Sequence, residues 1–419
     1  MTSAISFPAG FIWGTANSSH QAEGSNVHND WWEWEQQPGH IVHGHRSGRA
    51  NDFWNRYDED FAFLARLGLN HFRLSIEWSR VEPDEDRVDQ AALDHYRRML
   101  ESARQRGITP WVNLHHFALP RWFAAKGGFL REENLSFWRR HVERVGRTLM
   151  PLASHWHPIN EANAYAAAAY LMGVMPPGVK DLASFRQILR NTMLQYRDAY
   201  QTLKSIDARA RVGTIHVFIP LFPANPSDEN DIAQAQNFDG HLNAVPLHAL
   251  KEGVIALPGT EPEPIEGLRG AADFFGANYY SSVSVDHNKP GLTPYPPGQT
   301  RLNQIGSGFY PEGLLQVLRR VRDLELGVPT YVSENGTGTD DDAWRIEYIR
   351  AHLEMVARAI AEGCDVRGYF HWTSVDNFEW TYGWTAQFGL IGFDPETFER
   401  KPKPTAHWLG EVARSNVLR

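Results

Sequence analysis

The sequence contains very little cysteine and no long apolar segment. Cys364 is the single cysteine among 419 residues, which excludes an internal disulfide framework and a cysteine-based zinc site. Residues 1–16 show no basic stretch followed by an apolar one, and no apolar run elsewhere is long enough to span a bilayer. We therefore expect a soluble, cytoplasmic protein without a membrane partner.

Clustered positive charge is also missing. The formal net charge is −9 and no run of Lys and Arg occurs, so we expect no nucleic-acid partner, because phosphates are bound by clustered basic side chains. The Gly-rich segment 336–340 lacks the Gly-Lys-Ser/Thr continuation of a phosphate loop. Neither a dinucleotide fingerprint after a strand nor a G-x-S-x-G elbow is present. No cofactor is expected.

Aromatic side chains, by contrast, are abundant. The chain has 15 Trp and is 12% aromatic, and with 42% hydrophobic residues it can bury a large core. Most of these rings belong in the core. An excess of Trp near strand ends would also favour a carbohydrate ligand, because sugar rings present flat apolar faces that stack on indoles.

Short β-rich runs alternate with helical segments along the whole chain. In the helical segment 90–107, apolar residues recur at spacings of three and four, and the segment 343–363 repeats this pattern. Strands that alternate with helices pair in parallel, and eight such units close into a barrel. The predicted strands are 10–16, 70–78, 107–116, 154–161, 210–218, 272–280, 328–335 and 366–373.

These patterns predict the α/β class and a single (β/α)₈ TIM barrel over residues 1–419. The Pro- and Gly-rich stretches 219–231 and 286–311 follow the fifth and sixth strands. A barrel carries its active-site loops at this C-terminal face, so we expect elaborated loops there.

Polar and aromatic residues cluster where the predicted strands end, in the positions that carry function in such barrels. A Glu at a strand end commonly caps a helix or forms a surface salt bridge. Glu161 and Glu334, however, directly follow apolar strands and lie three strands apart on the ring, so they can face each other. Two carboxylates with hydrogen-bonding and stacking groups suit glycosidic bond hydrolysis. The set is Gln21, Arg73, His115, His116, Asn160, Glu161, Asn278, Tyr280, Glu334 and Trp372.

Two histidine motifs raise the alternative of a metal-dependent hydrolase. The first, HGH at 43–45, lies in a Gly- and Arg-rich loop rather than at the end of an apolar strand. In the second, His115 and His116 are adjacent on a predicted strand and should point to opposite faces. We therefore expect no metal site. Arg73 on a strand needs an anionic partner, and Glu334 is the candidate.

At this point six motifs can be compared with a known family. From about Phe7 onward the sequence resembles glycoside hydrolase family 1, the β-glucosidase family. The motifs occur in the family's order along the chain, and they are FPAGFIWGTANSSHQAEG (7–24), FRLSIEWSRVEP (72–83), INEAN (159–163), GANYY (276–280), YVSENG (331–336) and WTSVDNFEWTYGWTAQFGL (372–390).

The resemblance implies a retaining β-glycosidase that removes terminal nonreducing β-D-glucosyl residues from small β-glucosides and cello-oligosaccharides. It implies that Glu161 is the general acid/base and Glu334 the nucleophile, and that Arg73 and Tyr280 contact Glu334. It further implies sugar contacts from Gln21, His116, Asn160, Asn278, Tyr280, Trp372, Glu379, Trp380 and Phe388, with Asn278 beside the groups that contact the nucleophile.

Departures from the family pattern concern mainly the leaving-group side. By alignment, Asn163 and Ser307 occupy positions where many members have Trp, and Val217 replaces a polar Asn. Ala162 replaces a Pro after the acid/base, and Phe117-Ala118 replaces a Trp-Asp pair. We therefore expect an intact sugar site beside a reshaped site for the leaving group.

Several other activities fit the same site. β-Galactosidase, β-fucosidase or β-mannosidase specificity would change only one hydroxyl contact, which is worth about 1–3 kcal/mol. A 6-phospho-β-glycosidase is disfavoured because Glu379 would repel phosphate and that branch's Ser and Lys pattern is absent. A non-catalytic sugar-binding barrel, or a thioglucosidase-like member without its acid, is disfavoured by the presence of both Glu161 and Glu334.

Overall fold

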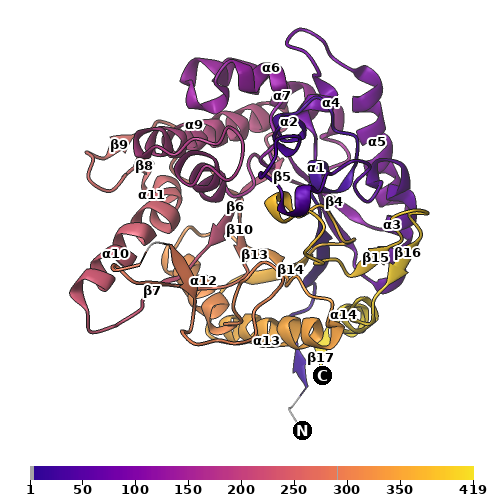
Figure 1. Cartoon of the computed structure of the whole chain (residues 1–419). Helices are drawn as coiled ribbons and strands as arrows, with labels where there is room; N and C mark the ends of the chain where they lie inside the picture. Colours follow the sequence, from indigo (N-terminus) through magenta and orange to yellow (C-terminus); the bar gives the residue numbers. More distant parts are fainter. Residues whose placement is uncertain (1–3, 290) are drawn as a thin grey trace.

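Eight parallel strands close into a barrel in the computed structural model, which describes residues 4–289 and 291–419. Around the barrel the strand order is β10-β13-β14-β2-β3-β4-β5-β6. Each strand falls within one of the predicted runs, so the (β/α)₈ prediction is confirmed (Figure 1). The strands are β2 (Ile12–Ala16), β3 (His71–Ser75), β4 (Thr109–Asn113), β5 (His155–His157), β6 (Arg211–Phe218), β10 (Phe274–Tyr279), β13 (Thr330–Asn335) and β14 (Val366–Trp372).

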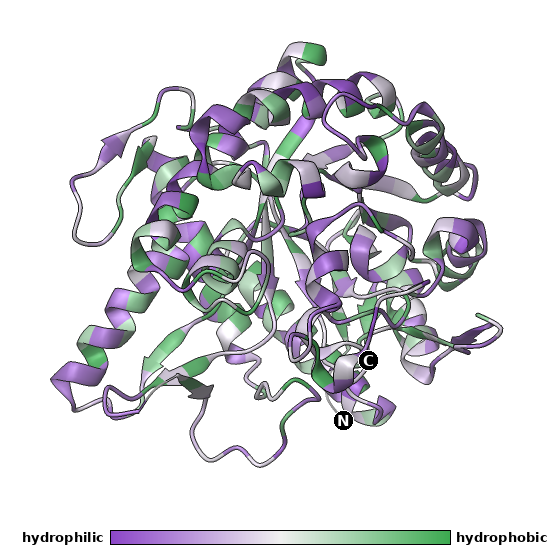
Figure 2. Ribbon diagram, turned by 45° about the horizontal axis from the view of Figure 1, so that its top comes forward, coloured by the Kyte–Doolittle hydropathy of each residue, from purple (hydrophilic) through white to green (hydrophobic). Residues whose placement is uncertain are grey.

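Helices surround the barrel (Figure 1). Figure 2 shows hydrophilic and hydrophobic residues alternating along them, as expected for helices with one buried face. The longer ones are α3 (Phe53–Leu67), α5 (Gln90–Gln105), α7 (Leu135–Leu149), α9 (Leu182–Ile206), α10 (Glu229–Asp239), α11 (Val245–Glu252), α12 (Glu312–Asp323), α13 (Asp342–Ala361) and α14 (Pro404–Ser415). The shorter ones are α1 (Ser19–Ala22), α2 (Asp30–Glu35), α4 (Trp78–Val81), α6 (Arg121–Ala125) and α8 (Ala162–Ala166).

Helix α5 illustrates why the sequence forms these elements. The Asp89 side chain accepts a hydrogen bond from the backbone N–H of Ala92, which caps the helix start. Leu93, Tyr96 and Leu100 are fully buried on one face. Directly after the helix, Gly107 adopts a left-handed φ of 75°, where glycine carries no steric penalty. The helix thus starts and ends where its sequence pattern does.

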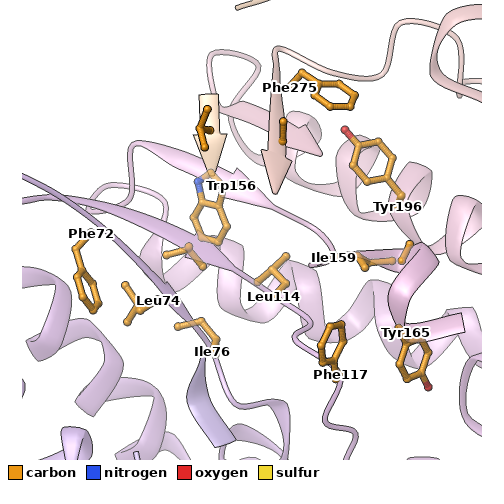
Figure 3. Close-up of a cluster of buried hydrophobic side chains, with 14 of the residues drawn as sticks. Phe72, Leu74, Ile76, Leu114, Phe117, Trp156, Ile159, Tyr165, Tyr196 and Phe275 are labelled. Carbon is orange, nitrogen blue, oxygen red and sulfur yellow. The ribbon is translucent and has the colours of Figure 1, made fainter. Parts of the chain in front are cut away.

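Two hydrophobic layers hold the barrel. Inside it, the Trp111 ring packs 4.8 Å from Phe370, 5.0 Å from Tyr331 and 5.4 Å from Phe274. Outside it, a larger cluster fills the space between strands and helices, and Figure 3 shows part of this cluster. Because aromatic rings fill the inside of the barrel, polar groups gather beyond the strands' C-terminal ends.

The long loops after β6 and β10 contain more structure than their composition indicates. Strands β7 (Leu221–Pro223), β11 (Val283–Val285) and β12 (Leu292–Pro294) form a three-stranded sheet beside the barrel. Elsewhere, β1 (Ile5–Ser6) pairs with β17 (Val417–Leu418), which supports the single-domain organisation; that organisation stays a prediction. None of the helices in the described ranges is both long and apolar enough to cross a membrane.

Candidate active site

A cavity of about 330 Å³ opens at the C-terminal ends of the barrel strands. Of the residues expected at the site, most line this cavity, and Gln21, Arg73 and Asn278 bond to the lining residues from behind. The lining members of the expected set are His116, Asn160, Glu161, Tyr280, Glu334, Trp372, Glu379, Trp380 and Phe388. The structure thus brings together side chains from segments far apart in the sequence.

Glu334 is held by two strong donors. It lies near the end of β13 and is only 3% exposed. The Arg73 guanidinium donates to its Oε1 atom and the Tyr280 hydroxyl donates to its Oε2 atom. Burial and the charge of Glu334 raise the pKa of Tyr280 well above its ordinary value, so Tyr280 keeps its proton. This arrangement stabilises an oriented carboxylate, and it supplies the anionic partner expected for Arg73.

Glu161 has a different environment. It precedes α8 and adopts a left-handed φ of 48°, a strained conformation for a residue with a side chain. The Asn278 amide donates to its Oε1 atom over 2.6 Å, and the Ser333 hydroxyl donates to Asn278 Oδ1 over 2.7 Å. Burial, followed by the charge of Glu334, raises the pKa of Glu161 well above its ordinary value. Both effects favour the protonated form of Glu161.

The position of Asn278 differs from the sequence expectation. We expected it to contact sugar beside the groups that touch Glu334, and its backbone does pair with Glu334 between β10 and β13. Its amide nevertheless bonds to Glu161, and Asn278 is fully buried and absent from the cavity wall. The reason is geometric: Glu161 follows β5, which only β6 separates from β10 in the closed barrel, so the Asn278 side chain reaches past a single strand.

His116 is neutral and fixed in one orientation. Its Nδ1 atom lies 3.2 Å from the Ser75 hydroxyl and its Nε2 atom 3.1 Å from the Asn160 amide nitrogen. Arg73 in turn donates to Asn160 Oδ1 over 3.1 Å. Because the Asn160 amide donates, Nε2 accepts and the proton resides on Nδ1. Burial, with the charge of Arg73, holds the pKa of His116 well below its usual range.

The neighbouring His115 turns away, as expected for adjacent residues. Its Nδ1 atom lies 3.2 Å from the amide of Gln195 on α9, and burial lowers its pKa to about 3. Within the described ranges, one His and Asp group has ligand atoms spaced for a metal: Asp228, Asp231 and His287, which do not line the cavity. His287 already bonds to Asp231 over 2.7 Å.

Glu379 completes the polar end of the cavity. Gln21 donates to its Oε2 atom over 3.2 Å, and Ser18 donates to Gln21 over 2.7 Å. Burial raises the pKa of Glu379 to about 8, opposed by Trp372 and Gln21. Only the family resemblance placed Glu379, Trp380 and Phe388 at the site, because they follow β14 in an irregular loop. A reading of strand ends alone misses them.

Of the three residues that the alignment placed on the leaving-group side, two line the cavity and one does not. Val217 and Ser307 line it as expected. Asn163 does not, since its amide donates to the carbonyls of Val217 and Leu242 over 2.8 and 2.9 Å. The turn at Glu161 directs Asn163 toward β6 rather than the cavity. Apolar side chains that the sequence analysis did not identify also line the cavity: Ala164, Met175, Ile219, Val283 and Ile305.

Comparisons with known proteins agree with this geometry. The model of glycosyl hydrolase family 1 matches residues 3–418. The 1,4-β-D-glucan glucohydrolase of Thermotoga neapolitana is 29% identical over 98% of this chain and 99% of its own length. The 6-phospho-β-galactosidase of Staphylococcus epidermidis is 28% identical over 98% of this chain and 99% of its own length.

A solved structure shows the same likeness. The β-glycosidase from Pyrococcus horikoshii is 36% identical to this chain and superposes with a TM-score of 0.91, covering 100% of this chain and 97% of its own. The chain forms a closed barrel, carries two buried carboxyl groups on one cavity and matches the family model over nearly its whole length. It therefore belongs to glycosyl hydrolase family 1 and is a glycoside hydrolase.

Proposed function

We propose that the protein is a retaining β-glucosidase that hydrolyses terminal nonreducing β-D-glucosyl residues of small β-glucosides and cello-oligosaccharides. This proposal rests on one observation: two carboxyl groups that line the same cavity have different hydrogen-bond donors. Glu334 receives a guanidinium and a phenol, whereas Glu161 receives a neutral amide and holds a proton. A retaining glycosidase needs this division between a nucleophile and a proton donor.

The chemistry proceeds in two displacements. Glu334 attacks the anomeric carbon and forms a glycosyl ester, while Glu161 gives its proton to the departing glycosidic oxygen. Formation of the ester neutralises Glu334, so the pKa of Glu161 falls and its carboxylate can accept a proton from water. That water attacks the anomeric carbon, releases glucose with retained configuration and restores both carboxyl groups.

The remaining residues bind the sugar in this proposal. Asn160 contacts the 2-hydroxyl, where hydrogen bonds strengthen in the transition state. Trp372 supplies the stacking platform and lies 5.7 Å from the His116 ring. Phe388 forms an aromatic wall, and its ring lies 6.2 Å from that of Tyr280. The other hydroxyls are bound by Gln21, His116, Glu379 and Trp380.

The phosphorylated alternative is disfavoured by charge. A relative in the comparisons acts on a 6-phosphoglycoside by its name. Among the residues that the structure describes, however, no Lys or Arg lines the cavity, and Glu379 lies in its polar end. A phosphate would therefore find no cationic partner on the cavity wall. We also propose a cytoplasmic location, which the single, buried Cys364 supports.

A hydrolysis panel tests the proposed specificity. The purified protein is assayed with 4-nitrophenyl β-glucoside, β-galactoside, β-fucoside, β-mannoside and 6-phospho-β-glucoside, with cellobiose beside them. We expect the highest kcat/KM among the aryl glycosides for the glucoside and measurable glucose release from cellobiose. A higher kcat/KM for the galactoside or fucoside would reassign the sugar, and turnover of the phosphorylated substrate alone would reject the proposal.

A further inference from the structure

We propose that His20 and Glu35 are positioning residues for the sugar site, and that they act through the indole of Trp380. This inference rests on the proposed function, in which Trp380 binds a hydroxyl of the sugar. His20 belongs to α1 and Glu35 is the last residue of α2, and both are fully buried outside the lining of the cavity. Neither belongs to the site residues expected from the sequence.

Trp380 lines the cavity in a backbone conformation that its surroundings must maintain. Its φ is 48°, in the left-handed region, and such a conformation persists in a residue with a side chain only where the neighbouring structure enforces it. The loop is tied to α1, because the backbone N–H of Phe378 donates to the Gln21 carbonyl over 3.1 Å. This bond holds the main chain. The orientation of the indole itself depends on the rings that pack against it.

Rings from three segments pack against the indole of Trp380. The His20 ring lies nearly parallel to it, with an interplanar angle of 13° and 6.0 Å between the ring centroids. Trp31 of α2 lies 4.5 Å away, and His116 and Phe117, which follow β4, lie 6.0 and 5.2 Å away. Aromatic pairs interact over such distances. Because His20 is the most nearly parallel of the four rings, a rotation of its plane would tilt the indole.

Hydrogen bonds set the plane of the His20 ring on one edge. Asn29 caps α2, and its side-chain oxygen accepts from the backbone N–H of Trp32 over 2.8 Å. The Asn29 amide nitrogen therefore faces His20 and donates to its Nδ1 atom over 3.0 Å. Since Nδ1 accepts, the N–H group of the ring is at Nε2.

The other edge of the His20 ring faces Glu35. Its Nε2 atom lies 3.6 Å from Oε2 of Glu35, and both side chains are fully buried. Within the described part of the chain, His20 is the one basic side chain at ion-pair distance from this carboxylate. Ser47 fixes the carboxylate, because its backbone N–H and its hydroxyl donate to the two oxygens over 3.1 and 2.9 Å. The anchored carboxylate attracts the N–H of His20 and so holds this edge of the ring.

These contacts form a continuous path from Glu35 to the sugar. Glu35 and Asn29 hold the two edges of the His20 ring, and the ring lies against the indole of Trp380. A ring that only filled the core would need no nitrogen at either edge. Small errors in the position of a binding group lower the rate, so the path should be visible in kinetics.

Deoxy substrates test this path. The kcat/KM values of the wild type, His20→Phe and Trp380→Phe are measured with 4-nitrophenyl β-glucoside and its 3-, 4- and 6-deoxy analogues. Trp380→Phe lacks the indole N–H, so it should lose least on the analogue without the hydroxyl that Trp380 binds. For His20→Phe we expect a loss of about three- to tenfold on the glucoside and less than about twofold on that same analogue. An equal loss on all four substrates would overturn the proposal.

A double-mutant cycle gives a second test. The kcat/KM of His20→Phe/Trp380→Phe should equal that of Trp380→Phe within about twofold, because no indole N–H remains to be oriented. Losses that multiply would overturn the path through Trp380. Glu35→Gln keeps the shape and removes the charge, and it should lose about two- to fivefold on the glucoside with the same pattern among the analogues. His248→Phe and Glu261→Gln, at exposed positions, are the matched controls and should keep the wild-type values.

The same assays separate a failure of this inference from a failure of the proposed function. A wild-type protein that turns over none of these substrates would reject the proposed glucosidase and, with it, this role of His20. Turnover by the wild type, with losses in His20→Phe that are the same for every analogue, would reject only the positioning role. Thermal unfolding shows which variants are folded, and the substrate pattern of Glu35→Gln decides if His20→Phe does not fold.

Discussion

The ends of β13 and β5 each place a glutamate on the same cavity, yet the two glutamates have different hydrogen-bond partners. At the end of β13, Glu334 accepts hydrogen bonds from Arg73 and Tyr280. Beyond the end of β5, Glu161 accepts one from the neutral amide of Asn278. A guanidinium favours the charged carboxylate, whereas burial beside another carboxylate favours the protonated acid. The difference shows that the neighbours, and not the residue type, set the role of each glutamate.

Buried charged and polar side chains form a hydrogen-bonded network across the barrel. Arg73 is fully buried and bonds both Glu334 and Asn160, and Asn160 in turn bonds His116. Because His116 stays neutral, Arg73 is the cation that this network offers to Glu334. Uncompensated buried charge is unfavourable, so each partner depends on the other. Substitutions on the two sides of the cavity should therefore have different consequences.

Removal of the Glu334 carboxylate should have the largest effect. Glu334→Ala is expected to lower kcat for 4-nitrophenyl β-glucoside by roughly ten-thousandfold or more, because no glycosyl ester can form. Azide should partly restore turnover and give a glucosyl azide of inverted configuration, detected by NMR. Glu252→Ala, at an exposed position outside the cavity, is the control. Activity near wild type in Glu334→Ala would contradict the proposed nucleophile.

Removal of the Glu161 carboxyl should have an effect that depends on the leaving group. Glu161→Ala is expected to lower kcat/KM for alkyl glucosides by about 10²- to 10⁴-fold, because their alkoxides need a proton to depart. Substrates with 2,4-dinitrophenol as leaving group need no proton and should lose far less in the first displacement. The measurement is kcat/KM against leaving-group pKa. An equal loss for all leaving groups would reject Glu161 as the proton donor.

The same comparison shows what the sequence can predict. Glu334 and Arg73 could be paired from sequence, because both lie on regular strands whose order around a barrel follows from the alternation of strands and helices. The positions of strand ends also located Glu161, His116, Asn160 and Tyr280. Regular elements have a fixed repeat, so their residues can be placed from their neighbours in sequence.

The features that the sequence did not predict lie in irregular segments, where the fixed repeat of helices and strands does not apply. The direction of Asn163 depends on the left-handed turn at Glu161, which no local pattern announces. The partner of Asn278 depends on how its side chain reaches past β6 and on a register shift between Ala277 and Asn278. Met175 and Ile219 line the cavity from loops, whose paths depend on tertiary contacts. Chemistry carried by loops was therefore predicted least well.

Substitution of Arg73, which bonds Glu334 on β13, should have an intermediate effect on kcat/KM. Arg73→Lys keeps a positive charge, but a lysine cannot bond Asn160 and Glu334 at once with the planar fork of a guanidinium. We expect kcat/KM for 4-nitrophenyl β-glucoside to fall about 10²-fold while the protein remains folded by circular dichroism. Arg367→Lys, at an exposed site, is the control. A loss smaller than about threefold would show that the fork is not needed.

The smallest effect is expected for Asn278, the hydrogen-bond partner of Glu161. It should appear as a change in the pH dependence of kcat/KM. The Asn278 amide stabilises the charged form of Glu161 and so opposes the rise in its pKa. In Asn278→Ala this opposition is lost, the pKa of Glu161 rises further, and the protonated acid persists to higher pH. We therefore expect the alkaline limb of kcat/KM to shift to higher pH, with a loss of about tenfold at the optimum.

Two variants sharpen this test of the β5 side. Ser333→Ala removes the hydroxyl that orients the Asn278 amide and should shift the alkaline limb in the same direction by less. Asn70→Ala, at an exposed position before β3, should leave the limb unchanged. A merely structural role for Asn278 would lower kcat/KM at every pH without moving the limb. A shift of the alkaline limb to lower pH would contradict this prediction, because it would mean that Asn278 stabilises the protonated form of Glu161. Burial and nearby charge alone would then distinguish the two glutamates.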